Sequence, residues 1–328
     1  MPRGLRMFKR QSLTILCYHG VVRSALPIPD YCFLEASRFQ TQMQWLARSH
    51  FRVAPLSEAI SDLLMGRVTQ PTVALTFDDG YRNNVDVALP ILQRFNFPAT
   101  IFLATGLIGS SKTIWPFRIL QALQSTAADS VTWGGRSFPL ATLAERTAAN
   151  KSLQSRVKEL APGTPDNAAA EIERLLEVQE NPDIDRNSPL AMMDADDVRL
   201  GVESGLLEFG AHSVTHPILS ALDDDGLRRE IDGSVQSIRQ MVPKPSRCFA
   251  YPNGLPADFD ARCITRLQDN GIAFAVSTVQ AMNRPGADAY RLGRLCIGCD
   301  TTMLKFIAKT TGVSRLPGLG WAKRMIGR

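Results

Sequence analysis

The sequence predicts an α/β fold in which about seven strand–helix repeats close into a distorted barrel, interrupted by one long helical insertion. Short runs of β-branched, aromatic and other apolar residues recur along the chain. Several are nearly continuous in apolar residues, as parallel strands buried on both faces are. Helical periodicities lie between most of these runs, which implies right-handed crossovers and a parallel sheet. The number of repeats favours closure into a barrel over an open sheet.

The expected strands are short apolar segments that end in polar or turn residues. In chain order they cover 13–19, 72–77, 99–105, 206–212, 247–251, 273–278 and 290–297. The helices between them have the apolar spacing of amphipathic helices. They cover 35–49, 85–95, 222–242 and 257–270. Asn83 and Asn84 stand just before the helix that begins near residue 85, and we expect them to cap it.

The region from about 107 to 200 breaks the alternation, because it reads as helices and polar loops without a convincing strand. It is too long for a plain loop, so we interpret it as a helical insertion between the third and fourth strands. Trp115, Phe117 and Trp133 either line a sugar-binding cleft or anchor this insertion to the barrel. The expected organisation is a basic segment 1–12, a barrel 13–300 that contains the insertion, and a C-terminal helix with a basic tail 301–328.

The composition is that of a soluble globular protein, with 45% hydrophobic and 21% charged residues. The net charge of +5 comes partly from the two ends of the chain, so it does not indicate a nucleic-acid partner. No stretch is long and apolar enough for a transmembrane helix, and the N-terminal residues lack the apolar core of a secretory leader. We therefore expect a cytoplasmic protein. The C-terminal residues around Trp321 and Lys323 would either contact an anionic membrane surface or form a frayed terminus.

The six cysteines fit a reducing compartment. Cys17 and Cys248 lie in apolar runs, where a free thiol behaves as a small hydrophobe. Cys296 and Cys299 form a CxxC pair, but no second pair completes a four-thiolate zinc site. We favour a structural origin for this spacing over a redox or metal-binding role.

A pair of acidic residues, Asp78 and Asp79, follows the predicted strand 72–77 and precedes Gly80. Barrel active sites are built at this end of the strands. Two adjacent carboxylates repel each other unless a cation or a proton intervenes, which favours a division of roles. One Asp would bind a metal ion and the other would accept a proton. The alternative is a simple Asp–Gly turn or helix cap.

Two histidines, His212 and His216, follow the predicted strand 206–212. At this spacing both imidazoles would lie on one face of a helical turn and could bind one ion, whereas the alternative is a pair of exposed loop histidines. With Asp79 they offer one oxygen and two nitrogens and leave positions open, as in a catalytic zinc site. Non-haem iron oxygenases share this ligand set, but the adjacent Asp78 argues against them. The sequence supports a phosphatase even less. In the commonest phosphatase pattern with an aspartyl-phosphate intermediate, one residue separates the two Asp residues.

The segments TFDDG (76–80), HSVTH (212–216) and FAYPNG (249–254) resemble the motifs of the NodB-homology polysaccharide deacetylases, carbohydrate esterase family 4. The resemblance implies a (β/α)7 barrel of the NodB type and a metal-dependent hydrolase, with Zn²⁺ as the expected cofactor. The substrate would be an N-acetylated carbohydrate, polymeric or lipid-linked. It further implies that Asp78 is the general base. The metal ligands would be Asp79, His212 and His216. The substrate would contact Tyr251, Pro252 and Asn253, with the Asn253 N–H at the oxyanion.

The sequence departs from this family at two places. Many members have Arg where this chain has Ala250, and Arg294 in the last predicted strand is a candidate replacement. Many members also carry a late Leu-x-x-His general acid, but no histidine follows His216. Tyr18-His19-Gly20 is similar to the Tyr–His opening of the circularly permuted poly-N-acetylglucosamine deacetylase branch, which implies that His19 is the acid. The alternative for His19 is a structural role at the strand end.

Two other functions stay open. A related amidase or deformylase acting on another small amide would share the barrel and the metal site. A catalytically inactive carbohydrate-binding barrel would be favoured if Asp78 or His19 were displaced from the metal site.

Overall fold

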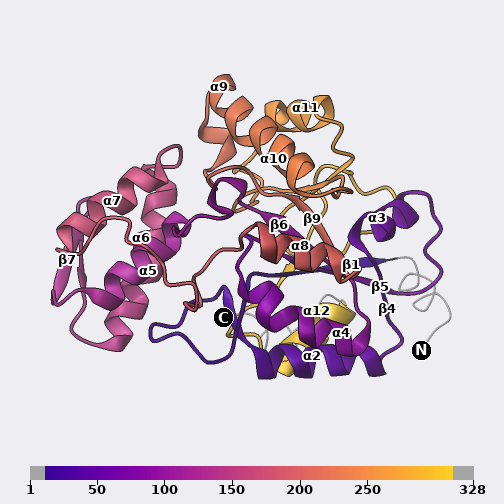
Figure 1. Cartoon of the computed structure of the whole chain (residues 1–328), viewed down its shortest axis with the longest axis horizontal. Coiled ribbons are helices and arrows are strands. Elements are labelled where there is room, and N and C mark those ends of the chain that lie inside the picture. Colours follow the sequence, from indigo (N-terminus) through magenta and orange to yellow (C-terminus); the bar gives the residue numbers. More distant parts are fainter. Residues whose placement is uncertain (1–11, 313–328) are drawn as a thin grey trace, which may run out of the picture.

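The computed structural model describes residues 12–312 and confirms an α/β barrel of parallel strands (Figure 1). Seven strands follow one another around a curled sheet in the order β11, β10, β9, β6, β5, β1 and β12. Their bounds are β1 Leu13–Tyr18, β5 Thr72–Phe77, β6 Ala99–Leu103, β9 Leu207–Ala211, β10 Cys248–Ala250, β11 Phe274–Val276 and β12 Leu295–Cys296. A short strand, β4 (Arg52–Val53), also pairs with β5.

The two ends of the sheet approach each other through the segment that leads into β12. Leu292 forms a parallel bridge with Val276 of β11, and the Ser277 N–H donates to the Leu292 carbonyl at 2.8 Å. The strand expected at 290–297 is therefore reduced to β12 and this bridge. The incomplete pairing at this seam is what distorts the barrel.

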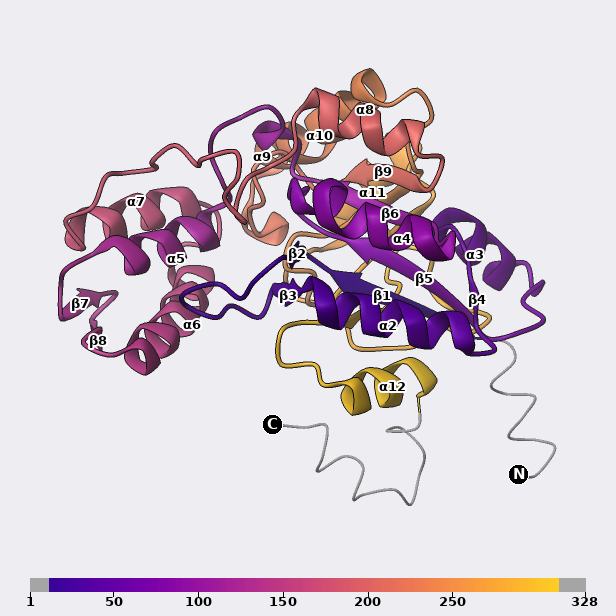
Figure 2. The ribbon, with the colours of Figure 1, turned by 60° about the horizontal axis from the view of Figure 1, so that its bottom comes forward.

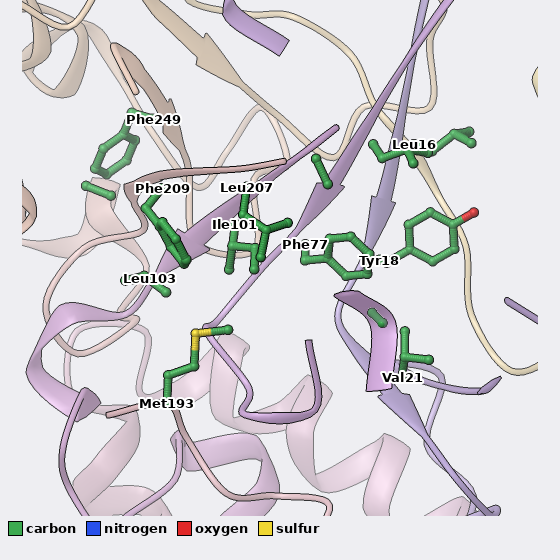
Figure 3. Packing of buried hydrophobic residues seen from close by; sticks show 14 of the residues in the cluster. Leu16, Tyr18, Val21, Phe77, Ile101, Leu103, Met193, Leu207, Phe209 and Phe249 are labelled. Atoms are coloured by element: carbon green, nitrogen blue, oxygen red, sulfur yellow. The ribbon is translucent and has the colours of Figure 1, made fainter. Parts of the chain in front are cut away.

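The strands pack on both faces, which explains their continuous apolar sequences. All six residues of β1 and all six of β5 are buried. One apolar layer, which includes Phe77, Ile101 and Phe209, fills the space between the sheet and the outer helices (Figure 3). A second layer, which includes Ile15 and Phe102, packs against α3 (Leu56–Leu64). We did not predict α3.

The helices of the barrel surround the sheet (Figures 1 and 2). They are α2 Ala36–Arg48, α4 Leu89–Phe95, α8 Ala195–Glu203, α9 Asp224–Leu227, α10 Gly233–Met241, α11 Ala261–Asp269 and α12 Met303–Thr311, with the π-helical turns η1 Asn84–Ala88 and η4 Arg228–Asp232 before α4 and α10. Figure 2 shows α2 and α4 side by side along one face of the sheet, where they contact each other. Two short strands, β2 (Gly20–Val22) and β3 (Phe33–Glu35), pair outside the barrel.

The chain between β6 and β9 forms a separate group of elements beside the barrel (Figure 1). It contains α5 Trp115–Ser125, β7 Ser130–Trp133, β8 Arg136–Pro139, α6 Leu143–Leu160 and α7 Pro165–Leu175. The expectation of no strand between 107 and 200 is wrong, because β7 and β8 form an antiparallel hairpin. Gly134 and Gly135 supply the positive φ angles that its two-residue turn requires, so this Gly–Gly pair was the available signal.

Trp115 and Trp133 are buried in an apolar core that this group shares with Val22, Phe33 and Tyr81 from outside it. The Trp133 indole N–H also donates to Glu171 at 3.0 Å. In contrast, α8 packs on the barrel, since Gly201 lies against the ring of Phe209.

All six cysteines lie among the described residues and are free thiols. Within residues 12–312, no helix combines the length and the hydrophobicity that a membrane span requires. Trp321 and Lys323, which we considered for membrane contact, lie outside the described residues.

Candidate active site

Asp78 and Asp79 lie side by side at the carboxyl end of β5 and are both buried. The backbone leaves the strand direction here, because Asp79 has a φ of 75° and Gly80 a φ of 91°. The Asp78 N–H donates to the Tyr18 carbonyl at 3.0 Å, which ties this turn to β1. The turn lets two adjacent side chains face the same rim of the barrel, which a continuing strand would not allow.

His212 and His216 follow β9 at the same rim, but they do not lie on a helical turn as we expected. Residues 212–218 form a loop in which Ser213 has a φ of 64° and His216 a φ of 66°. The His216 N–H donates to the Ser213 hydroxyl at 3.0 Å. The left-handed residues bring both imidazoles to one side, so the pair converges through loop geometry rather than helical spacing.

The loop is held from outside by Glu230 of η4. Its carboxylate accepts hydrogen bonds from the Val214 N–H (2.8 Å), the Thr215 N–H (2.9 Å) and the Thr215 hydroxyl (2.7 Å). Sequence reasoning missed Glu230, since it lies in an amphipathic segment with no motif of its own.

The side chains of Asp79, His212 and His216 converge on one point. Asp79 Oδ1 lies 3.5 Å from His212 Nε2 and 3.6 Å from His216 Nε2. This oxygen is buried and has no hydrogen-bond partner among the described residues. His212 Nδ1 lies 2.7 Å from the Ala250 carbonyl, which leaves Nε2 free to face the point of convergence. The three donors therefore fit a divalent cation of the zinc class.

Burial and neighbouring charges shift the pKa of all three groups. Burial lowers the pKa of His216 to about 3, so its imidazole is in the neutral form that binds metals. Burial alone would raise the pKa of Asp79, but the His212 imidazole, 3.5 Å from Asp79 Oδ1, and the nearby charge of His19 bring that pKa below the usual value. Burial opposes protonation of His212, yet Asp78 and Asp79 together raise its pKa.

Asp78 is held by Arg294, which is fully buried. The guanidinium donates from Nη1 to Asp78 Oδ1 at 2.6 Å and from Nη2 to Oδ2 at 2.7 Å. Arg294 Nε donates to the Ser277 carbonyl at 3.0 Å, which fixes the plane of the guanidinium group. Burial would raise the pKa of Asp78, but the charge of Arg294, followed by His212, holds that pKa well below the usual carboxyl range.

His19 lies at the end of β1 and lines the same cleft as the two aspartates. One of its ring nitrogens lies within 4.8 Å of an Asp78 carboxylate oxygen. The Asn84 amide donates to the His19 carbonyl at 2.7 Å, and the Asn83 amide oxygen accepts from the Val21 N–H at 2.8 Å. These asparagines therefore brace the chain around His19 and are not the helix caps that we expected.

The loop after β10 contributes Asn253 to the cleft, but the expectation of substrate contact by the Tyr251 side chain is wrong. Tyr251 is fully buried, stacks on Phe259 at 3.7 Å between ring centroids, and donates its hydroxyl to the Tyr290 carbonyl at 3.1 Å. Pro252 is buried too and does not line the cleft. Successive side chains point to opposite faces of a strand, so the Tyr251 ring lies in the apolar layer between the sheet and the outer helices.

The cleft has a volume of about 830 Å³ and runs between the barrel rim and the α5–α6 side of the neighbouring group. Phe117 lines it and also packs edge-on against Phe33 and Tyr81. The residues of this wall that we did not predict include Tyr31, Gln154, Ser155, Lys158 and Glu159, and those on the barrel side include Leu255, Asp258, Thr278 and Gln280. Gln154, Ser155, Lys158 and Glu159 share one face of α6, so helical spacing was the available signal for them, whereas the others follow no common motif.

The barrel and its rim of acidic and imidazole groups define a hydrolase, and comparison with known proteins gives its family. Residues 65–159 and 167–275 match the family model described as polysaccharide deacetylase. The chain therefore belongs to the polysaccharide deacetylase family, whose members are hydrolases of non-peptide carbon–nitrogen bonds, and it is an enzyme of carbohydrate N-deacetylation.

Among curated proteins, the chain is similar to the poly-β-1,6-N-acetyl-D-glucosamine N-deacetylase of Staphylococcus epidermidis. The two are 23% identical over 324 residues, which cover 91% of this chain and 84% of that protein. Among solved structures, IcaB from Ammonifex degensii aligns with a TM-score of 0.58 at 19% identity, covering 95% of this chain and 97% of that one. The Streptococcus pyogenes deacetylase PplD aligns with a TM-score of 0.55 at 16% identity, covering 89% and 94%. These structures share the fold.

Proposed function

We propose that this protein is a metal-dependent N-deacetylase that removes acetyl groups from an N-acetylated carbohydrate. The observation that carries the proposal is the convergence of Asp79 Oδ1 and two imidazole Nε2 atoms beside Asp78, which Arg294 holds in its ionised form. In this proposal Asp79, His212 and His216 hold the ion, for which Zn²⁺ suits the two nitrogens and one oxygen.

In this proposal, the residues around the metal position each have a different role in amide hydrolysis. When bound, a divalent ion polarises the amide carbonyl and makes a water molecule more acidic. Asp78 accepts the proton of the attacking water, since it is ionised and faces the same rim. The backbone N–H of Asn253 donates to the oxyanion that develops on the carbonyl carbon. His19 then donates a proton to the departing sugar amine, which is a poor leaving group as an anion.

The substrate proposal is an N-acetylated sugar in a polysaccharide or a lipid-linked glycan. The cleft volume of about 830 Å³ suits a sugar chain better than a single small amide. The name of the Staphylococcus epidermidis relative, an N-acetylglucosamine polymer deacetylase, supports the same class. The cytoplasmic location stays a prediction.

The alternative of an inactive barrel requires Asp78 or His19 to lie away from the metal site. Both residues line the cleft that also contains Asp79, His212 and His216, which favours an active enzyme.

Release of acetate from N-acetylated oligosaccharides and lipid-linked sugars tests the proposal, with and without a chelator. We expect Asp78→Asn and His19→Ala each to lower kcat by about 100-fold or more, because each removes a proton-transfer group. His50→Ala is the matched control, since His50 is exposed and stacks only on Phe51. Turnover that survives complete removal of metal would contradict the metal assignment, and full activity of His19→Ala would remove His19 from the mechanism.

A further inference from the structure

Two cysteines lie next to the proposed general base, on neighbouring strands. Cys17 of β1 and Cys296 of β12 are register partners in a parallel pair. Their side chains therefore point to the same face of the sheet, with their backbones about 4.8 Å apart. Cys17 is fully buried, and its sulfur lies 3.5 Å from Asp78 Oδ2. Cys296 is partly exposed and lines the cleft.

Cys17 belongs to a cluster of donors that differs from the Asp79 cluster. Cys17 Sγ, one ring nitrogen of His19 and one carboxylate oxygen of Asp78 all lie within 4.8 Å of one another. His19 Nδ1 is buried and has no hydrogen-bond partner among the described residues. Cys296 adjoins Cys17 from the neighbouring strand. The cluster thus offers one sulfur, one nitrogen and one oxygen, and Cys296, the register partner of Cys17, lies at its cleft side as the source of a second sulfur.

The protonation of the two thiols favours a cation. The hydrogen bond with Cys17 and the charge of Arg294 lower the pKa of the Cys296 thiol to about 6. The same hydrogen bond, together with burial, raises the pKa of the Cys17 thiol. The charge of Arg294 and the shared hydrogen bond thus favour the thiolate at Cys296, the sulfur that lines the cleft.

We propose that Cys17, Cys296, His19 and Asp78 form a second cation site, which binds a thiophilic divalent ion such as Zn²⁺ or Cd²⁺. Thiolates select such ions over hard cations. The site is distinct from the Asp79, His212 and His216 cluster, which contains no sulfur.

The charges of this site balance when it is filled. Binding releases the proton of Cys17 to solvent, so two thiolates and the Asp78 carboxylate carry three negative charges in total. The divalent ion and the Arg294 guanidinium, which contacts Asp78, supply three positive charges. A buried site of zero net charge avoids the desolvation cost that an uncompensated ion would have.

An ion in this site would inhibit the enzyme. It would engage the carboxylate that accepts the proton from water and the imidazole that protonates the leaving amine. This consequence rests on the proposed function, whereas binding of the ion does not. We expect activity to fall by about 100-fold as the site fills, which is the contribution of one proton-transfer group.

The test uses the full-length reduced protein loaded with one equivalent of Zn²⁺ and titrated with Cd²⁺. Ultraviolet absorption from thiolate-to-cadmium charge transfer reports on the sulfur site, since Cd²⁺ that replaces Zn²⁺ at Asp79, His212 and His216 has no thiolate ligand. Acetate release is followed in the same titration. Cys17→Ala and Cys296→Ala are the test variants, with circular dichroism to check that each is folded. Cys299→Ser, at the other end of the CxxC pair and outside the cluster, is the matched control.

We expect the wild type and Cys299→Ser to gain the absorption and to lose activity together. Each test variant should lack the absorption and should need at least about 10-fold more Cd²⁺ for inhibition, because it has lost a ligand. The same absorption in wild type and in folded Cys296→Ala would overturn the proposal. If the absorption requires both cysteines but no substrate is deacetylated, the cation site stands and the proposed function fails.

Discussion

The charge beside Asp78 comes from a part of the chain that is distant in sequence. Many relatives would place an Arg where this chain has Ala250, at the end of β10. Here Arg294, 216 residues after Asp78, enters from the segment before β12 and forms a two-point contact with the carboxylate. A short side chain at 250 leaves room in the barrel interior, so the cation can reach the same carboxylate from another strand.

At this scale we predict that Arg294→Met moves the acid limb of the pH–activity profile to higher pH. In the proposed mechanism Asp78 acts as a base only above its pKa, and Arg294 is the main charge that lowers this pKa against the effect of burial. Without the guanidinium, burial raises the pKa, so the carboxylate is neutral at a pH where the wild type is ionised. We expect kcat/KM at neutral pH to fall by about 100-fold.

The measurement is a profile of kcat/KM against pH for both proteins. Arg291→Met is the control, because Arg291 is exposed and pairs with Asp288 at the surface. An unchanged acid limb together with wild-type kcat/KM in Arg294→Met would show that Arg294 does not tune Asp78.

Among elements, the loop after β9 depends on a helix for its shape. Three hydrogen bonds to Glu230 of η4 hold Val214 and Thr215, which lie between the two histidines. Two residues of this loop, Ser213 and His216, have left-handed backbones, which cost free energy unless neighbouring contacts fix them. The convergence of the imidazoles is therefore a property of two elements together.

We accordingly predict that Glu230→Ala weakens metal binding by about 10-fold to 100-fold, the usual effect of losing an outer contact to a metal ligand. The affinity is measured by competition with a chromophoric chelator. Asp225→Ala, in α9 nearby, is the control because its partner Arg228 is exposed. Equal affinities for Glu230→Ala and the wild type would mean that the loop keeps its shape without this carboxylate.

The group of elements beside the barrel contains a buried ion pair that joins α5 to α7. Arg118 donates from Nε to Glu173 Oε1 at 3.0 Å, and Glu173 is fully buried. Burial opposes the charge of Arg118, but the hydrogen bond and charge of Glu173 raise the pKa of Arg118, so the guanidinium stays ionised.

For this pair we predict that Glu173→Ala lowers the free energy of unfolding by about 3 kcal/mol, because it removes the buried partner of the guanidinium and leaves only the half-exposed Asp166 at 3.2 Å. The double variant Arg118→Met/Glu173→Met should stay near the wild type, since apolar side chains of similar volume remove both charges. Denaturant unfolding followed by circular dichroism gives the values. Glu180→Ala, which breaks an exposed pair with Arg174, serves as the control. A double variant as unstable as Glu173→Ala would contradict this explanation.

For the whole molecule, the cleft exists only because α6 lies opposite the barrel rim. Ser155 and Lys158 of α6 line it together with His216 and Asn253 of the barrel. The wall on the α6 side is thus placed to contact sugar units beyond the one that is deacetylated.

We predict that Ser155→Trp raises KM for an N-acetylated oligosaccharide by about 10-fold, a loss of about 1.4 kcal/mol of binding, because the ring occupies the cleft. The turnover of a single N-acetylated sugar should change little. Lys151→Trp, on α6 but outside the cleft, is the control. Steady-state kinetics with both substrates makes the comparison, and equal effects on the two substrates would mean that α6 does not contact the longer one.

The barrel and the meeting of Asp79, His212 and His216 at its rim could be predicted from the sequence. Continuous apolar strands report burial on both faces, and parallel strands bring their carboxyl ends to one rim, so residues that follow strands must meet. Other features could be seen only in the folded structure. Glu230 holds the histidine loop, and Tyr251 turns away from the cleft. Cys296 lies beside Cys17 rather than pairing with Cys299, and α6 forms the opposite wall. The reason is physical: local patterns record whether a residue is buried, whereas its partner depends on strand register and loop conformation, which distant segments fix jointly.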